Sequence, residues 1–141
     1  RRTQVALGRG RVDGLLSPAM MRVMTWTAPD VERTDPPYVA DERTRLDGWL
    51  DFHRATLLRK CARLTAGNWP GHPGSTDFDL ASPATAEADF ATYAAEIQSA
   101  RLALAGRSLD ERFGDESHTA DLRWLYTHMI DEYVRHNGHA A

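Results

Sequence analysis

Three segments of the chain repeat apolar residues at steps of three and four, and this spacing constrains the fold more than any other feature. It is the period of an amphipathic α-helix. Glycine, proline and polar residues separate the segments and interrupt helices. Alternation typical of strands does not reach a convincing length. The sequence therefore predicts an all-α protein, with an antiparallel helical bundle as the natural packing.

The first predicted helix begins near Asp41. Its apolar stripe consists of Leu46, Leu50, His53, Leu57, Cys61 and Leu64. The opposite, solvated side carries Arg45, Asp47, Arg54, Arg59 and Lys60. We interpret Cys61 as a small core residue and Trp49 as a packing anchor.

Two more helices follow a long loop. The second is predicted to begin at Pro83, with Ser82 as its N-cap, and to stop at Gly106. A polar connection, 107–118, leads to the last helix, which Thr119 is expected to cap, with Asp121 in its first turn. The last helix has the apolar residues Leu122, Leu125, Tyr126, Met129, Ile130 and Tyr133, and Trp124 as a second expected anchor.

The chain of 141 residues is long enough for one core. Residues 1–40 lack a sustained period and contain several glycines and prolines, so they predict an irregular N-terminal arm. We interpret Met24 as the natural start, with non-native residues before it. Residues 41–141 form the predicted bundle domain.

Charge and composition exclude several classes of protein. The net charge is −3, and no basic block could coat a phosphate backbone, which argues against nucleic acid as a partner. No apolar run approaches the roughly 20 residues that span a membrane. The single cysteine, Cys61, excludes an intrachain disulfide. A protein of the reducing cytoplasm is expected.

Glu132 and His136 are the residues most suited to chemistry. They lie four apart on the last predicted helix, so their side chains stack roughly 6 Å apart on one face. At about 100° per residue they fall about 60° and 20° from Met129, which predicts that they face the interior. A divalent cation such as zinc, nickel or iron would satisfy both. Alternatively, Glu132 pairs with Arg135 or His128 while His136 lies half-buried near the helix end.

The other histidines have weaker patterns. His53 interrupts an apolar stripe, as a hydrogen-bonded core residue or as a ligand. His128 lies too far along the helix to share one ion with both Glu132 and His136. His72 and His139 are expected at the surface.

Two stretches of the sequence resemble a known family. They are DERTRLDGWLDFHRATLLRKC, from Asp41 to Cys61, and LRWLYTHMIDEYVRHNGHA, from Leu122 to Ala140. Both are similar to actinobacterial DinB-like domains, which belong with mycothiol-dependent S-transferases such as maleylpyruvate isomerase. The resemblance covers roughly residues 24–61 and 82–141. It implies a four-helix bundle that binds a divalent metal, here expected to be zinc or nickel, through a histidine on its second helix and two ligands, either His and His or Glu and His, four residues apart on its last core helix. Glu132 and His136 match that pair.

The sequence departs from this family after Leu64. The second helix of the family is expected there, but the chain continues with Asn68-Trp69-Pro70-Gly71. A third metal ligand would then come from His53, His72 or a neighbouring chain. A bundle without one helix exposes an apolar groove, so we expect a homodimer.

Two functions are compatible with these residues. The first is a metal-dependent S-transferase that uses mycothiol as its thiol cosubstrate and acts on a small electrophile; the metal would favour the nucleophilic thiolate. Its metal ligands would be Glu132, His136 and His53. The alternative is a catalytically inactive helical module that dimerises or binds a small molecule.

Overall fold

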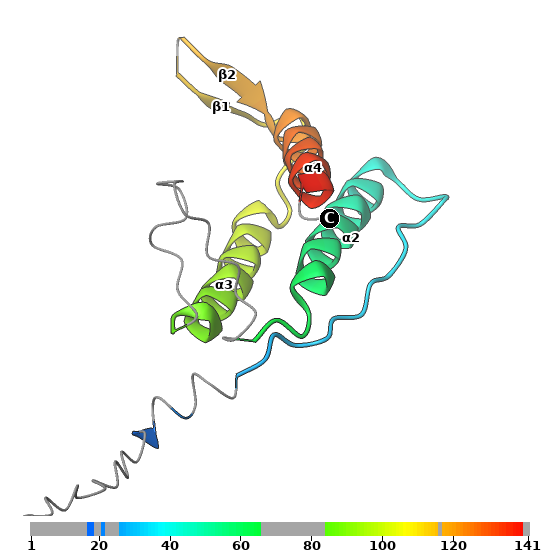
Figure 1. The fold of residues 1–141 in the computed structure, drawn as a ribbon. Helices are drawn as coiled ribbons and strands as arrows, with labels where there is room; N and C mark the ends of the chain where they lie inside the picture. Colours follow the sequence, from blue (N-terminus) through cyan, green and yellow to red (C-terminus); the bar gives the residue numbers. More distant parts are fainter. Residues whose placement is uncertain (1–16, 19–20, 22–25, 66–83, 116, 140–141) are drawn as a thin grey trace, which may run out of the picture.

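The computed structural model describes residues 17–18, 21, 26–65, 84–115 and 117–139. Figure 1 shows three long helices and one short hairpin in this part of the chain. The elements are α2 (Glu42–Cys61), α3 (Ala86–Leu104), β1 (Arg112–Gly114), β2 (Thr119–Asp121) and α4 (Leu122–His139). The all-α prediction is confirmed. No helix among the described residues is long and apolar enough to cross a membrane.

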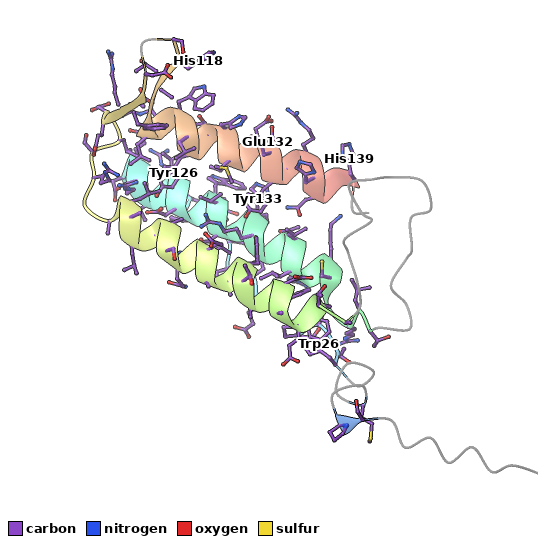
Figure 2. The ribbon with its side chains drawn as sticks, turned by 90° about the vertical axis from the view of Figure 1, so that its left-hand side faces the viewer. Trp26, His118, Tyr126, Glu132, Tyr133 and His139 are labelled. Carbon is purple, nitrogen blue, oxygen red and sulfur yellow. The ribbon has the colours of Figure 1, made fainter. Side chains whose placement is uncertain are left out.

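Consecutive helices run antiparallel, as predicted. Arg43, at the start of α2, donates to the carbonyl of Leu104 at the end of α3 over 3.1 Å. Arg123, at the start of α4, donates to Glu42 at the start of α2 over 2.6 Å. Thus α2 and α4 run in the same direction and α3 opposes both, with the three axes nearly aligned in Figure 2.

The core lies mainly between α2 and α4. Leu50, Leu122 and Tyr126 are its buried centre. Half-buried apolar residues surround this centre: Leu46, Leu104, Leu109, Leu125, Met129, Ile130 and Tyr133. The Tyr126 hydroxyl donates to Asp47 over 2.6 Å, which gives this buried polar group a partner on the neighbouring helix. The apolar stripe predicted for the last helix therefore forms the core.

Local signals set the ends of two helices. The Asp41 carboxylate accepts from the backbone N–H of Thr44 over 3.0 Å, which is the geometry of an N-cap. Hydrogen bonds from the side chain and the backbone of Thr44 lower the pKa of Asp41. The helix α3 ends at Leu104, and Gly106 has a φ of 73°, a left-handed conformation that favours glycine. The predicted stop at Gly106 is confirmed.

Residues 26–40 run alongside α2 without forming a helix. Ala28 is buried, and its backbone exchanges hydrogen bonds with Arg63 and Leu64 just beyond α2. A Cβ at Gly48 would lie 3.0 Å from Cδ of Pro37, so this glycine permits the close approach of the arm. The interpretation of Met24 as the natural start concerns a residue outside the described part.

Two predicted helix starts were wrong. The helix α3 begins at Ala86, three residues after Pro83, which lies with Ser82 outside the described residues. The connection before α4 forms a hairpin that sequence analysis missed, and Thr119 pairs with Gly114 inside it. Since the hairpin engages Thr119, the capping role passes to Asp121, whose carboxylate accepts from the Trp124 N–H over 2.7 Å.

The expected burial of three side chains was also wrong. Trp49 and Trp124, predicted to be anchors, are 45% and 53% exposed. Arg54, placed on a solvated face, has a side chain only 13% exposed, because α3 and the arm cover this side of α2. The arm and α3 therefore leave α2 a narrower solvated side than the sequence suggests.

We expect Tyr126→Phe to lower the free energy of unfolding by about 1–2 kcal/mol, because it removes a hydrogen bond to a carboxylate and leaves Asp47 without this partner. Urea unfolding measures the change. Tyr38→Phe is the matched control, since Tyr38 is 95% exposed. Equal losses in both variants would contradict this role of Tyr126.

The same tyrosine predicts a loss of stability at alkaline pH. Burial, followed by the hydrogen bond to Asp47, raises the pKa of Tyr126 to about 12. The folded state therefore favours the protonated phenol, and this contribution is complete below about pH 10, the pKa of an unperturbed tyrosine, and disappears as the pH approaches 12. Between roughly pH 9 and pH 12, the free energy of unfolding should fall less steeply in Tyr126→Phe than in the wild type. Identical slopes would exclude Tyr126 as a contributor.

Candidate functional site

Glu132 and His136 form a contact on the outer side of α4. The Nε2 atom of His136 lies 3.5 Å from Oε2 of Glu132. The Glu132 side chain is 31% exposed and that of His136 is 69% exposed. The prediction that both face the interior is thus wrong for His136, and Glu132 lies at the margin of the core.

The separation of these two atoms suits a shared metal ion. Ligand atoms about 2.0–2.2 Å from a tetrahedral zinc ion lie roughly 3.4 Å from each other. The observed 3.5 Å is close to this value without a change of backbone. The pair therefore fits two adjacent positions of a metal site.

Arg135 contacts the other oxygen of the same carboxylate. Its Nη1 lies 3.6 Å from Oε1 of Glu132, and its Nη2 donates to Asp131 over 2.9 Å. The alternative pairing of Glu132 with Arg135 is thus present in the structure. Because Arg135 uses Oε1 and His136 faces Oε2, the two contacts do not compete for one oxygen.

His53 is not grouped with this pair among the described residues. The side-chain amide of Asn137 donates to the backbone carbonyl of His53 over 3.0 Å. The His53 ring stacks on Trp49 at 5.8 Å between centroids. The structure does not bring His53 to Glu132, and its ligation stays a prediction.

Other histidines do not complete the site. His128 stacks on Trp124 with the ring centroids 4.7 Å apart. The His139 ring lies 6.3 Å from that of His136. His72 lies outside the described residues. Within the part of the chain that the structure describes, no three His, Cys, Asp or Glu side chains are grouped to hold a metal.

The protonation of two further groups follows from their surroundings. Burial, with a smaller contribution from nearby Arg33, lowers the pKa of His53, so neutral pH leaves this imidazole uncharged. Burial raises the pKa of the Cys61 thiol. A protonated, half-buried thiol agrees with the interpretation of Cys61 as a small core residue.

Asn137 and Lys60 hold the last turn of α4 and were missed by sequence analysis. Asn137 is buried, and its backbone carbonyl accepts from the Lys60 ammonium over 2.6 Å. A cation at a helix C-terminus satisfies an unpaired carbonyl and favours the helix dipole. This contact fixes the turn that carries His136. A buried asparagine has no periodic signal that would reveal it.

A second feature is a cavity of about 590 Å³ between α2, α3 and the arm. Its lining includes Trp26, Arg54, Leu58, Phe90, Tyr93 and Ile97. The hydroxyl groups of Tyr93 and Tyr133 lie 2.9 Å apart and connect α3 to α4 beside this cavity. Burial, and then this hydrogen bond, raises the pKa of Tyr93 well above its usual value, so the Tyr93 phenol stays protonated at neutral pH.

Comparison with known families shows which family the chain belongs to. The family model described as mycothiol S-transferase matches residues 67–141, more than half of the chain. The chain belongs to the mycothiol S-transferase family. The match confirms the resemblance inferred from the sequence, and it includes α4 with Glu132 and His136, whereas α2 precedes the matched residues.

Nothing among curated proteins or solved structures matches the chain. The suggestion that this family member lacks the second helix concerns residues 66–83, which are outside the described part.

We expect Lys60→Met to lower the free energy of unfolding by about 1 kcal/mol, because it removes the charge-assisted hydrogen bond to the carbonyl of Asn137. Amide hydrogen exchange should show the loss of protection mainly in the last turn of α4. Arg59→Met, at an exposed neighbouring position, is the matched control. Unchanged protection in Lys60→Met would show that this contact does not hold the turn.

Proposed function

We propose that this member of the mycothiol S-transferase family is a metal-dependent enzyme that joins mycothiol to a small electrophile. Glu132 and His136 would hold a divalent ion, zinc or nickel. The observation that carries the proposal is their 3.5 Å contact on α4, inside the residues that match the family. The single cysteine of the chain agrees with action in the reducing cytoplasm.

A bound divalent cation would favour the thiolate form of the thiol, which is its nucleophilic form. The sulfur would form a bond with the electrophilic carbon, and the thiol proton would pass to solvent. Either a leaving group would then depart with its electron pair, or the anionic adduct would take a proton from solvent. We assign no acid–base residue to this chain. His53 is the third ligand that the sequence suggests, but its ring would first have to leave Trp49, so the contacts of this chain support only Glu132 and His136 as ligands.

Neighbouring residues orient Glu132 and His136 without the metal. Arg135 contacts Oε1 of Glu132 and leaves Oε2 directed toward His136. An outer partner of this kind orients a ligating carboxylate. Lys60, through the carbonyl of Asn137, fixes the turn next to His136. The arrangement therefore limits the side-chain freedom that metal binding would have to remove.

A second candidate function rests on the cavity between α2, α3 and the arm. Its volume of about 590 Å³ and its aromatic residues Trp26, Phe90 and Tyr93 suit a small apolar molecule. The chain would then be a catalytically inactive binding module, with Glu132 held by Arg135 and His136. Ligand binding that persists without metal, together with no transferase activity, would favour this alternative.

We expect Glu132→Ala and His136→Ala to lose the bound metal, because each removes one of two adjacent ligands. Elemental analysis of proteins purified without chelators and without a histidine tag measures this loss. The controls Glu96→Ala and His118→Ala remove exposed side chains of the same types, and Figure 2 shows His118 at the tip of the hairpin, away from Glu132. Both controls should retain wild-type metal content.

Activity provides the second measurement for the same variants. Conjugation of mycothiol to an activated aryl chloride forms a carbon–sulfur bond and releases chloride, which can be followed directly. The two ligand variants should lose most of this activity, while the two controls retain it. A wild-type protein that contains no metal and transfers no thiol would overturn the proposed enzyme.

A further inference from the structure

We propose that a second copy of this chain completes the site, so that the α4 helices of two copies share one metal ion. This inference rests on the ligand pair of the proposed function. It assigns an interface to the outer face of α4, defined here by Trp124, His128, Glu132 and His136. It also specifies the occupant of that face, which is the same face of another chain.

The first argument is the position of the pair. The residues of the outer face follow each other at steps of four, so they form one stripe that advances about 40° per step. His136 and Trp124 on this stripe are more than half exposed. Figure 2 shows Glu132 and His139 along α4, away from the hairpin. A second protein can reach this stripe without unfolding of the bundle.

The second argument is the number of ligands. Zinc is usually held by four ligands, and a catalytic zinc ion by three protein groups and a water or substrate. Glu132 and His136 supply two, and no third His, Cys, Asp or Glu side chain of the described residues joins them. In an interface with twofold symmetry each copy presents the same residues. Two copies therefore offer two carboxylates and two imidazoles around one ion, and a thiol could replace one of these groups.

The third argument is charge. Two Glu132 carboxylates balance a divalent cation, whereas one copy would leave the site with a net positive charge. Without the ion the same two carboxylates would face each other and repel. The shared site thus predicts a dimer that forms only with metal. Trp124 and His128, stacked at 4.7 Å, add an aromatic surface to the stripe.

The test is the mass of the full chain in solution while zinc is added. With zinc the mass should double from the 15.8 kDa of one chain, the binding curve should end at one zinc per two chains, and a chelator should restore the monomer. Glu132→Ala and His136→Ala should stay monomeric at zinc concentrations that saturate the wild type. Glu96→Ala, an exposed glutamate on α3, should dimerise like the wild type.

Other outcomes separate this inference from the proposed function. A monomer that binds one zinc per chain through Glu132 and His136 would overturn the shared site and leave the proposed ligands in place. A dimer that persists in chelator and in His136→Ala would also overturn it, since the interface would not need the ion. A wild-type chain that binds no zinc would overturn both proposals.

Discussion

The packing of α2 against α4 determines the rest of this structure. Leu50, Leu122 and Tyr126 form its buried centre, and the hydrogen bond from Tyr126 to Asp47 fixes how far α4 is rotated about its axis. A buried hydroxyl whose partner lies on the neighbouring helix allows little rotation, because loss of the bond leaves a polar group unsatisfied. At the other end of α4, the side chain of Asn137 donates to the carbonyl of His53 on α2 and restricts the same rotation.

This rotation places two kinds of polar side chain on different sides of α4. Tyr133 turns toward α3, where its hydroxyl meets that of Tyr93, while Glu132 and His136 turn outward. The core therefore contains a hydrogen-bonded pair of phenols, and the groups able to bind a cation lie at its margin. Burial of both a carboxylate and an imidazole would have required internal partners for each. Their outward position avoids this cost and leaves them available to an external ligand.

The sequence predicted the helices and the core well because both follow from the period of the apolar residues. It was wrong about His136 because this residue lies in the last turn of α4, beyond Tyr133, where the apolar core ends. The buried residues of α4 are Leu122, Tyr126 and Asn137, which centre about 50° from Met129 on the side away from Glu132. Asn137 is polar, so no hydrophobic pattern includes it. The hairpin escaped prediction since each strand has only three residues, and its formation moved the cap of α4 from Thr119 to Asp121.

The contact between Glu132 and Arg135 raises the question of whether an ion pair already satisfies this carboxylate. Exposed ion pairs are worth about 0–1 kcal/mol, whereas structural zinc sites bind with roughly 10–16 kcal/mol. Even a weak two-residue site therefore needs only a small part of that energy to dominate the pairing. Arg135 also contacts Oε1, so Oε2 can bind an ion while the arginine stays in place. The pairing and the metal are compatible, and the decisive variable is the number of further ligands.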